Sequence, residues 1–129
     1  MNADTKKIDF FYWAPRVLAI VFICFLALFA LDVFIPGKTL GYYFVAFFMH
    51  LIPNFVLAGI LVVAWKHESA GGLLFLFTAI FFTLFFKTYL LLPHFIIVSF
   101  PIVLISILFL AHGSLPSKTY SSLKRLYRR

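Results

Sequence analysis

Four apolar stretches dominate this sequence, and each is long enough to cross a lipid bilayer as a helix. They cover residues 17–35, 42–65, 73–92 and 95–111. The hydrocarbon core of a bilayer is ~30 Å thick, which takes roughly 17 to 25 residues of helix. Apolar residues make up 64% of the chain and charged residues only 12%, so too little polar surface remains to cover a soluble globule. We therefore expect a membrane protein.

Proline and glycine residues mark the ends of these stretches. Pro36-Gly37 follows the first stretch, Gly71-Gly72 precedes the third, and Pro93 separates the third from the fourth. Both residue types are unfavourable inside helices and common at their ends. The sequence therefore predicts an all-α fold, a transmembrane four-helix bundle. The expected segments are an interfacial N-terminal segment at 1–16, the helical domain at 17–112 and a basic tail at 113–129.

The positions of the basic side chains predict how the bundle is oriented. Only two of the 11 Lys and Arg residues, Lys38 and Lys87, fall on one side of the expected membrane. The other nine fall on the opposite side: Lys6, Lys7, Arg16, Lys66 and five residues of the tail. Basic residues concentrate on the cytoplasmic side of membrane proteins, so both termini are expected to be cytoplasmic. The net charge of +7 is thereby explained as a topology signal, and no nucleic-acid partner is expected.

The basic tail allows two interpretations. Tyr120, Leu123, Leu126 and Tyr127 recur at helical spacing between basic residues, which fits a short amphipathic helix on anionic lipid. The alternative is a solvated tail whose charge only fixes the topology. In both cases the membrane lipids are the expected partners of this segment.

Five polar side chains fall in the outer half of the expected bilayer and form the candidate binding site. They are Asp32, His50, Asn54, Lys87 and His94. An ionisable side chain at mid-bilayer costs roughly 2.5–3.5 kcal/mol on insertion scales, so each one needs an explanation. The five side chains either line an outward-open polar cavity or form an interhelical network that only holds the helices together.

Asp32 and Lys87 are the only charged residues within the four stretches. With both helices running outward, the two side chains lie at matching depth, about 10 Å and about 9 Å beyond the centres of their spans. A buried ion pair between the first and third helices would compensate both charges. The alternative is that Lys87 extends to the outer headgroups while Asp32 caps a helix end.

Small and weakly polar residues recur at helical spacing on three of the predicted helices. Such stripes let helix backbones approach closely, so they are expected to face other helices and not lipid. The stripes are Ala46, His50, Asn54 and Ala58 on the second helix, Gly72, Ala79, Thr83 and Lys87 on the third, and Ser99, Ser106 and Gly113 on the fourth.

Cofactor and catalytic motifs are not apparent. His50 and His67 bracket the second helix, and His94 and His112 the fourth, which suggests two stacked bis-histidine haem sites. The two histidines on each helix are about 26 Å apart, however, so three of the four lie at or beyond the membrane interfaces. No zinc-ligand spacing and no soluble-enzyme motif occurs. We therefore expect no cofactor, no metal and no catalytic residue.

Glu68 lies near the second turn between helices. We expect it to pair with Arg16 or with Lys66, or to be hydrated.

Several short segments together resemble a known protein family. They are Pro15-Arg16, the residues 29–32, the residues 50–53, and Ala64-Trp65-Lys66 followed by Glu68 and Gly71-Gly72. The combination is similar to a family of small prokaryotic four-span membrane proteins of unknown function. The resemblance implies a bacterial inner membrane as the setting, and it implies no substrate, reaction or catalytic residue.

The favoured interpretation is a non-enzymatic integral membrane protein that acts as a homo-oligomer or as an accessory subunit of a larger membrane assembly. The small-residue stripes and the absence of an extramembrane domain in the sequence motivate it. A transport or small-ligand-binding protein that uses the outer polar cluster is the alternative, and a b-type haem electron carrier is a third possibility.

The orientation can be tested by cysteine labelling in intact cells. An impermeant thiol reagent is expected to modify a Lys38→Cys variant and to leave a Ser117→Cys variant unmodified, because only position 38 is expected outside. Labelling at position 117 from outside would reverse the orientation and place the polar cluster on the cytoplasmic side.

Overall fold

A computed structural model describes residues 3–114 of the chain. Its elements are α1 (Ala3–Leu28), the 3₁₀ helix η1 (Phe29–Val33), α2 (Leu40–Lys66), α3 (Glu68–Phe85), the 3₁₀ helix η2 (Thr88–Leu90), α4 (Leu92–His94), the π-helix η3 (Phe95–Ser99) and α5 (Phe100–Gly113). The predicted all-α fold is confirmed. The tail helix expected within 113–129 lies almost wholly outside the described residues.

Four helical segments are long and apolar enough to cross a membrane. They are Tyr12–Val33, Leu40–Lys66, Glu68–Phe85 and Leu92–Gly113. The number and order of these segments match the four predicted spans. The shortest has 18 residues, about 27 Å of helix, which is close to the thickness of the hydrocarbon core.

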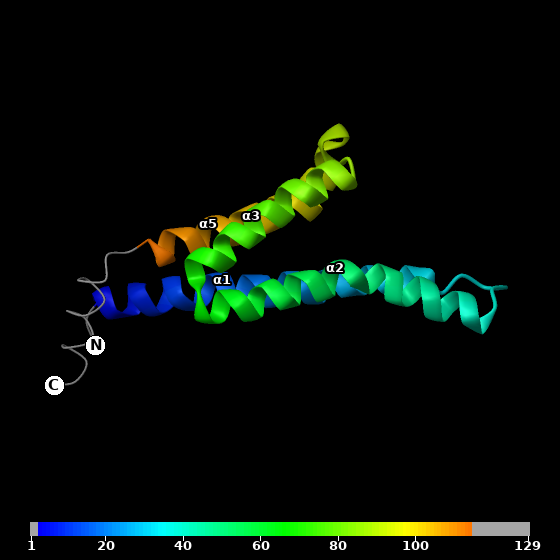
Figure 1. Ribbon diagram of the computed structural model, residues 1–129, viewed down its shortest axis with the longest axis horizontal. Helices are drawn as coiled ribbons and strands as arrows, with labels where there is room; N and C mark the ends of the chain where they lie inside the picture. The colour runs from blue at the N-terminus through cyan, green and yellow to red at the C-terminus, as the bar shows by residue number, and fades with distance from the viewer. Residues whose placement is uncertain (1–2, 115–129) are drawn as a thin grey trace.

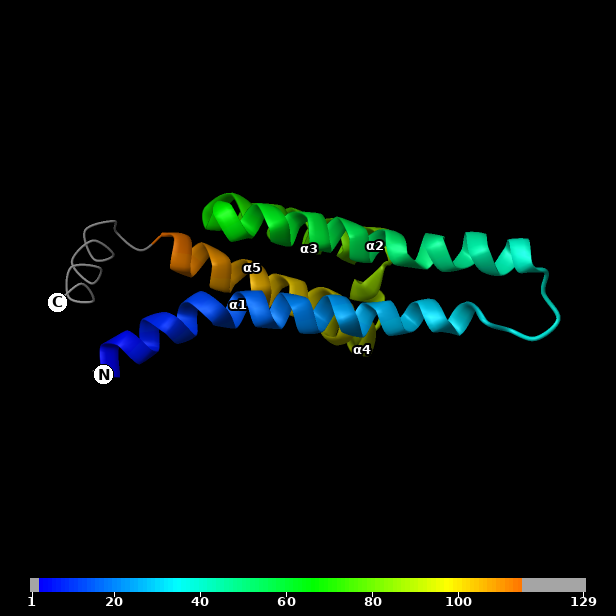
Figure 2. The same ribbon diagram turned by 90° about the horizontal axis from the view of Figure 1, so that it is seen from below.

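The helices form two antiparallel pairs. One pair is the hairpin of α1 and α2, and the other consists of α3 and α5 (Figure 1). The pairs lie close together near the turn from α2 to α3 and diverge toward the connections at 34–39 and 86–91 (Figure 1). The view turned by 90° shows α1 and α2 side by side, joined by their connection (Figure 2). We call the first region the closed end of the bundle and the second the open end.

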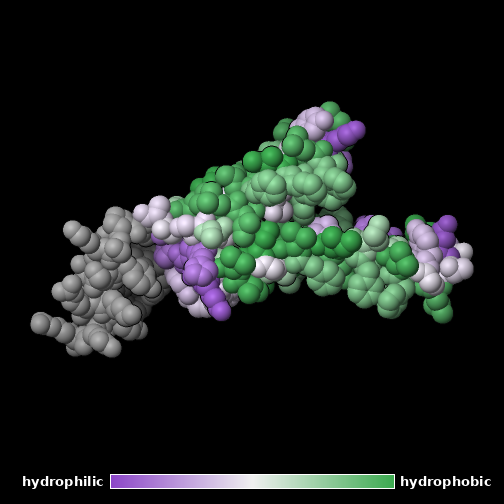
Figure 3. Space-filling model, viewed as in Figure 1, coloured by the Kyte–Doolittle hydropathy of each residue, from purple (hydrophilic) through white to green (hydrophobic). Residues whose placement is uncertain are grey.

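The outer surface of the bundle is apolar along most of its length. Figure 3 shows hydrophobic residues covering both helical pairs, with hydrophilic residues gathered at the two ends. Only 22% to 33% of the most apolar part of each span is buried inside the chain. An apolar surface of this extent is stable in contact with lipid and unstable in water.

The packing of α3 against α5 follows the predicted stripes of small residues. Ser106 Oγ donates to the Gly72 carbonyl at 2.9 Å, and a side chain at Gly72 would lie within 2.8 Å of Leu110 Cγ. The rings of Phe75 and Phe109 stack with their centroids 5.6 Å apart. Small residues thus bring the two backbones together, and aromatic rings fill the space beside them.

The turn between α2 and α3 is unusually tight, because only His67 separates the two helices. Gly71 and Gly72 do not precede the third helix, as the sequence predicted, but lie inside it. A Cβ at Gly71 would lie 2.2 Å from the Ala64 Cβ. The close contact between the helices explains why glycine stands in the helix interior here.

The third helix also ends earlier than its predicted limit of residue 92. α3 ends at Phe85, and Lys87 has a left-handed backbone with φ of 51°. A residue in this conformation commonly terminates a helix, although glycine is the usual choice. The following turn is held by a hydrogen bond of 2.7 Å between the hydroxyl groups of Thr88 and Ser99.

The π-helical segment η3 has a local cause in Pro101. This proline has no N–H group, and its ring would collide with the carbonyl four residues earlier in a regular helix. The preceding amide, Phe100 N–H, bonds to the Phe95 carbonyl five residues earlier, so the turn widens ahead of the proline. The widened turn carries Val98, which lines a cavity described below.

The turn between α2 and α3 predicts a sharp contrast between two glycine substitutions. Gly71→Ala should lower the free energy of unfolding by about 3 kcal/mol or more, because its methyl group overlaps Ala64. Gly59→Ala, also within a helix, should be neutral or slightly stabilising, since no atom lies within 4 Å of the added carbon. Thermal unfolding in detergent compares the two. Equal melting temperatures would contradict the close contact.

Candidate functional site

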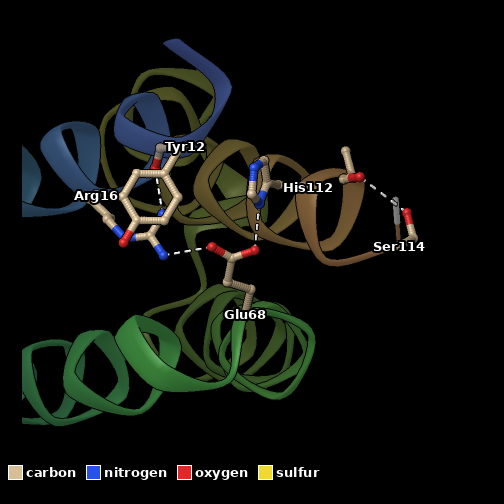
Figure 4. Close-up of polar contacts among 6 residues, drawn as sticks. Tyr12, Arg16, Glu68, His112 and Ser114 are labelled. Carbon is tan, nitrogen blue, oxygen red and sulfur yellow. Dashed lines mark hydrogen bonds and ion pairs between the residues drawn. The ribbon is translucent and has the colours of Figure 1, made fainter. Parts of the chain in front are cut away.

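A cluster of polar side chains joins three helices at the closed end. We call it the Glu68 node, and it consists of Tyr12, Arg16, Glu68 and His112 (Figure 4). Glu68 Oε1 accepts a hydrogen bond from Arg16 Nη2 at 2.6 Å, and Glu68 Oε2 pairs with His112 Nδ1. One carboxylate therefore connects α1, α3 and α5.

Arg16 is the most deeply buried charged residue of the node, with 1% of its surface exposed. Its Nη1 donates to the Tyr12 carbonyl, and its Cζ lies 3.6 Å from the centroid of the Tyr12 ring. The rings of Trp65 and Phe109 lie 5.6 Å from the same atom. The guanidinium is thus compensated by one carboxylate and surrounded by aromatic faces.

The geometry of the Glu68 node favours a structural role, that of holding the helices together. A ligand has no access to a guanidinium that is almost fully buried. Removal of either partner from a buried ion pair leaves an uncompensated charge, so the pair strongly favours this arrangement of the helices. Two of its nitrogen atoms, Arg16 Nε and His112 Nε2, are buried without a hydrogen-bond partner among the described residues.

The sequence identified this node only in part. Arg16 was one of the two predicted partners of Glu68, with hydration as the other possibility, and it is the correct partner. His112 was considered only as a haem ligand, and its pairing with Glu68 was not predicted. The available signal was its position, because the charge distribution places the end of the fourth span on the same side as Arg16 and Glu68.

The five predicted site residues at the open end do not come together as one cluster. The expected ion pair between Asp32 and Lys87 is absent, since both ion pairs among the described side chains involve Glu68. Lys87 lies beyond the end of α3, and α3 diverges from the end of α1 (Figure 1). Asp32 in η1, Lys87 and His94 in α4 are all exposed.

Two of the five residues, His50 and Asn54, do share a site. Asn54 is 6% exposed, and its Nδ2 donates to the Ile23 carbonyl at 3.1 Å, which links α2 to α1. His50, one turn earlier on α2, is exposed, and its Nδ1 lies 2.8 Å from the Ala46 carbonyl. His50 therefore bonds to the backbone of its own helix, whereas Asn54 links two helices.

His50 and Asn54 line a cavity of about 500 Å³ between the two helical pairs. We call it the interpair cavity. Its other lining residues are Leu26, Phe29, Met49, Ile52, Pro53, Phe82, Phe85, Phe86 and Val98. The walls come from both pairs, and the cavity lies on the side where the two pairs separate (Figure 3). Its lining is apolar apart from these two side chains.

A second cavity, of about 470 Å³, borders α2 and α3. It shares Ile52, Pro53 and three phenylalanines of α3 and its C-terminal end with the interpair cavity. Side chains therefore leave unfilled space beside the contact between α2 and α3. The contact between α3 and α5 is more closely packed.

A model of the domain of unknown function DUF7670 matches residues 2–122 of the chain. The chain belongs to this family. No curated protein and no solved structure matches it. The resemblance to a small four-span family of unknown function is thereby confirmed.

Membership of the DUF7670 family assigns no activity, so the function has to be argued from the residues of this chain. Two arrangements in this DUF7670 protein stand out. The Glu68 node fixes three helices at the closed end, and the interpair cavity separates the pairs at the open end. Only the second has space for another molecule.

The Glu68 node predicts strong coupling between Arg16 and Glu68. Glu68→Gln should lower the free energy of unfolding by about 3 kcal/mol, because Arg16 then remains buried without a counter-charge. The double variant Arg16→Met with Glu68→Leu should lose less than the sum of its single variants. Lys66→Gln, an exposed change near the same turn, is the control. Additive losses, measured by thermal unfolding in detergent, would contradict the coupling.

Proposed function

We propose that this membrane protein is non-enzymatic and that it binds a small apolar or amphiphilic molecule in the interpair cavity. The cavity volume of about 500 Å³ carries the proposal, because small-molecule sites typically measure about 300–1,000 Å³. The apolar lining with two polar side chains matches the usual composition of such sites. The geometry thus favours ligand binding, the alternative interpretation of the sequence, over a purely structural role.

The position of the cavity supports a binding role that involves both helical pairs. Leu26 and Phe29 come from the first pair, whereas Phe82 and Val98 come from the second. A bound molecule would therefore contact both pairs at the end where they diverge. Because the Glu68 node joins the pairs at the closed end, occupancy of the cavity would set the angle between them.

A second candidate function is that of a homo-oligomer or an accessory subunit. The small buried fraction of every span, 22% to 33%, favours it, since a large apolar surface is free to contact another polypeptide. In this case a helix of the second polypeptide would fill the interpair cavity. The two candidates therefore predict different occupants of one site.

The proposed setting is a bacterial inner membrane with both termini in the cytoplasm. The distribution of Lys and Arg supports the orientation, and the polar ends of an otherwise apolar surface support the membrane placement (Figure 3). In this orientation the open end faces the outer leaflet. The occupant of the cavity would then enter laterally from lipid.

A cavity-filling substitution tests the proposal. Val98→Trp should fill part of the interpair cavity and displace its occupant, whereas Ile97→Trp places the same side chain at an exposed neighbouring position outside the lining. The protein and both variants are extracted into native nanodiscs, and the bound small molecules and the oligomer mass are measured by native mass spectrometry. We expect the wild-type protein and Ile97→Trp to retain a bound molecule that Val98→Trp lacks.

Two results would argue against ligand binding. Equal retention in all three proteins would show that the bound molecule lies elsewhere. A wild-type dimer without a bound small molecule, converted to a monomer by Val98→Trp, would favour the second candidate instead.

A further inference from the structure

The polar atoms of the interpair cavity restrict the chemistry of its occupant. Of the residues that line it, only His50 and Asn54 carry polar side-chain atoms. The hydrogen bonds that these two side chains already make determine which of their atoms remain free. The remaining atoms in turn determine whether the occupant must donate or accept a hydrogen bond.

The orientation of the Asn54 amide is fixed by its partner. The Ile23 carbonyl can only accept a hydrogen bond, so the atom 3.1 Å from it must be the amide nitrogen, Nδ2. The amide oxygen, Oδ1, is then the free atom. It is buried and has no hydrogen-bond partner among the described residues. A buried acceptor without a donor is unfavourable by about 1–3 kcal/mol, so a donor from a bound molecule would stabilise the site.

The same reasoning applies to His50. Its Nδ1 lies 2.8 Å from the Ala46 carbonyl, which again can only accept, so Nδ1 carries the proton. In the neutral imidazole the other nitrogen, Nε2, is then an acceptor. The side-chain atoms of His50 and Asn54 that have no partner among the described residues are therefore both hydrogen-bond acceptors.

The cavity also offers no charge to an ionised ligand. Its lining contains neither an acidic nor a basic side chain apart from His50. A carboxylate or phosphate group would face two acceptors without a compensating cation. An ammonium group would find acceptors and aromatic rings, but it would be buried without a carboxylate. A neutral donor satisfies the site without either disadvantage.

We propose that the interpair cavity binds a neutral amphiphile with a hydroxyl head group, which donates a hydrogen bond to Asn54 Oδ1. The hydrocarbon part of the molecule contacts the phenylalanines and aliphatic side chains of the lining. His50 Nε2 offers a second acceptor to a molecule with more than one hydroxyl group. This inference rests on the proposed ligand-binding function and adds the chemical class of the ligand.

Four probes with the same hydrocarbon chain separate the head group from the chain. They are dodecanol, dodecane, dodecanoate and dodecylamine, each titrated into the protein in phosphatidylcholine nanodiscs and measured by native mass spectrometry. We expect dodecanol to bind about fivefold more tightly than dodecane, the effect of one net hydrogen bond. Both ionised probes should bind more weakly than dodecanol.

An Asn54 variant assigns the preference to the proposed atom. Asn54→Leu keeps a similar volume and removes Oδ1, so it should abolish the preference for dodecanol while dodecane binds as before. Thr83→Val removes a hydroxyl group from α3 outside the cavity lining and should preserve the preference. If Asn54→Leu does not fold, the order of the affinities of the four probes for the wild-type protein tests the inference.

The outcomes distinguish this inference from the proposed function. Tighter binding of dodecanoate or dodecylamine than of dodecanol would overturn the inference. A preference for dodecanol that persists in a folded Asn54→Leu variant would overturn it as well. In both cases, binding of dodecane would still support the cavity as a ligand site. Failure of all four probes to bind the wild-type protein would overturn the proposed function together with the inference.

Discussion

The buried charge of Arg16 is the constraint on which the rest of the structure depends. A guanidinium with 1% exposure requires a counter-charge, and Glu68 supplies it from the first residue of α3. His112 pairs with the other carboxylate oxygen and adds α5 to the same contact. Three helices are thereby fixed relative to one another at the closed end. The divergence at the open end is compatible with a stable bundle because the strongest polar contacts lie at the closed end.

Lipid explains why the rest of the bundle is packed unevenly. The apolar side chains of a membrane helix gain little by leaving lipid for protein, so close approach and hydrogen bonds decide which helices associate. α3 and α5 have both, through Gly72 and Ser106. α2 and α3 meet closely only near Gly71, and farther along phenylalanine side chains border cavities on both sides. A gap at this position therefore does not require a large loss of hydrophobic stabilisation.

The sequence predicted the features that depend on local composition and missed those that depend on angles between helices. Hydropathy identified the four spans, and the stripes of small residues predicted close helix packing, which α3 and α5 show. The early end of α3 was missed because no glycine marks the left-handed position that Lys87 occupies. Of the two interpretations of Asp32 and Lys87, the ion pair was wrong, because equal depth does not imply proximity when helix pairs diverge. His50 and Asn54 were selected for their stripe on one helix, which a sequence can reveal, whereas the cavity beside them depends on the angle between the pairs.

The single-residue connection between α2 and α3 means that a change in the angle between these helices moves their far ends the most. With only His67 between them, and with Gly71 against Ala64, the two helices have a fixed pivot at one end. α3 extends about 27 Å from this pivot, so a rotation of about 10° would displace its far end by about 5 Å. Small rearrangements around the carboxylate of Glu68 would thus be magnified at the opposite face of the membrane. Such an amplification of movement needs only two long helices and a short connection between them.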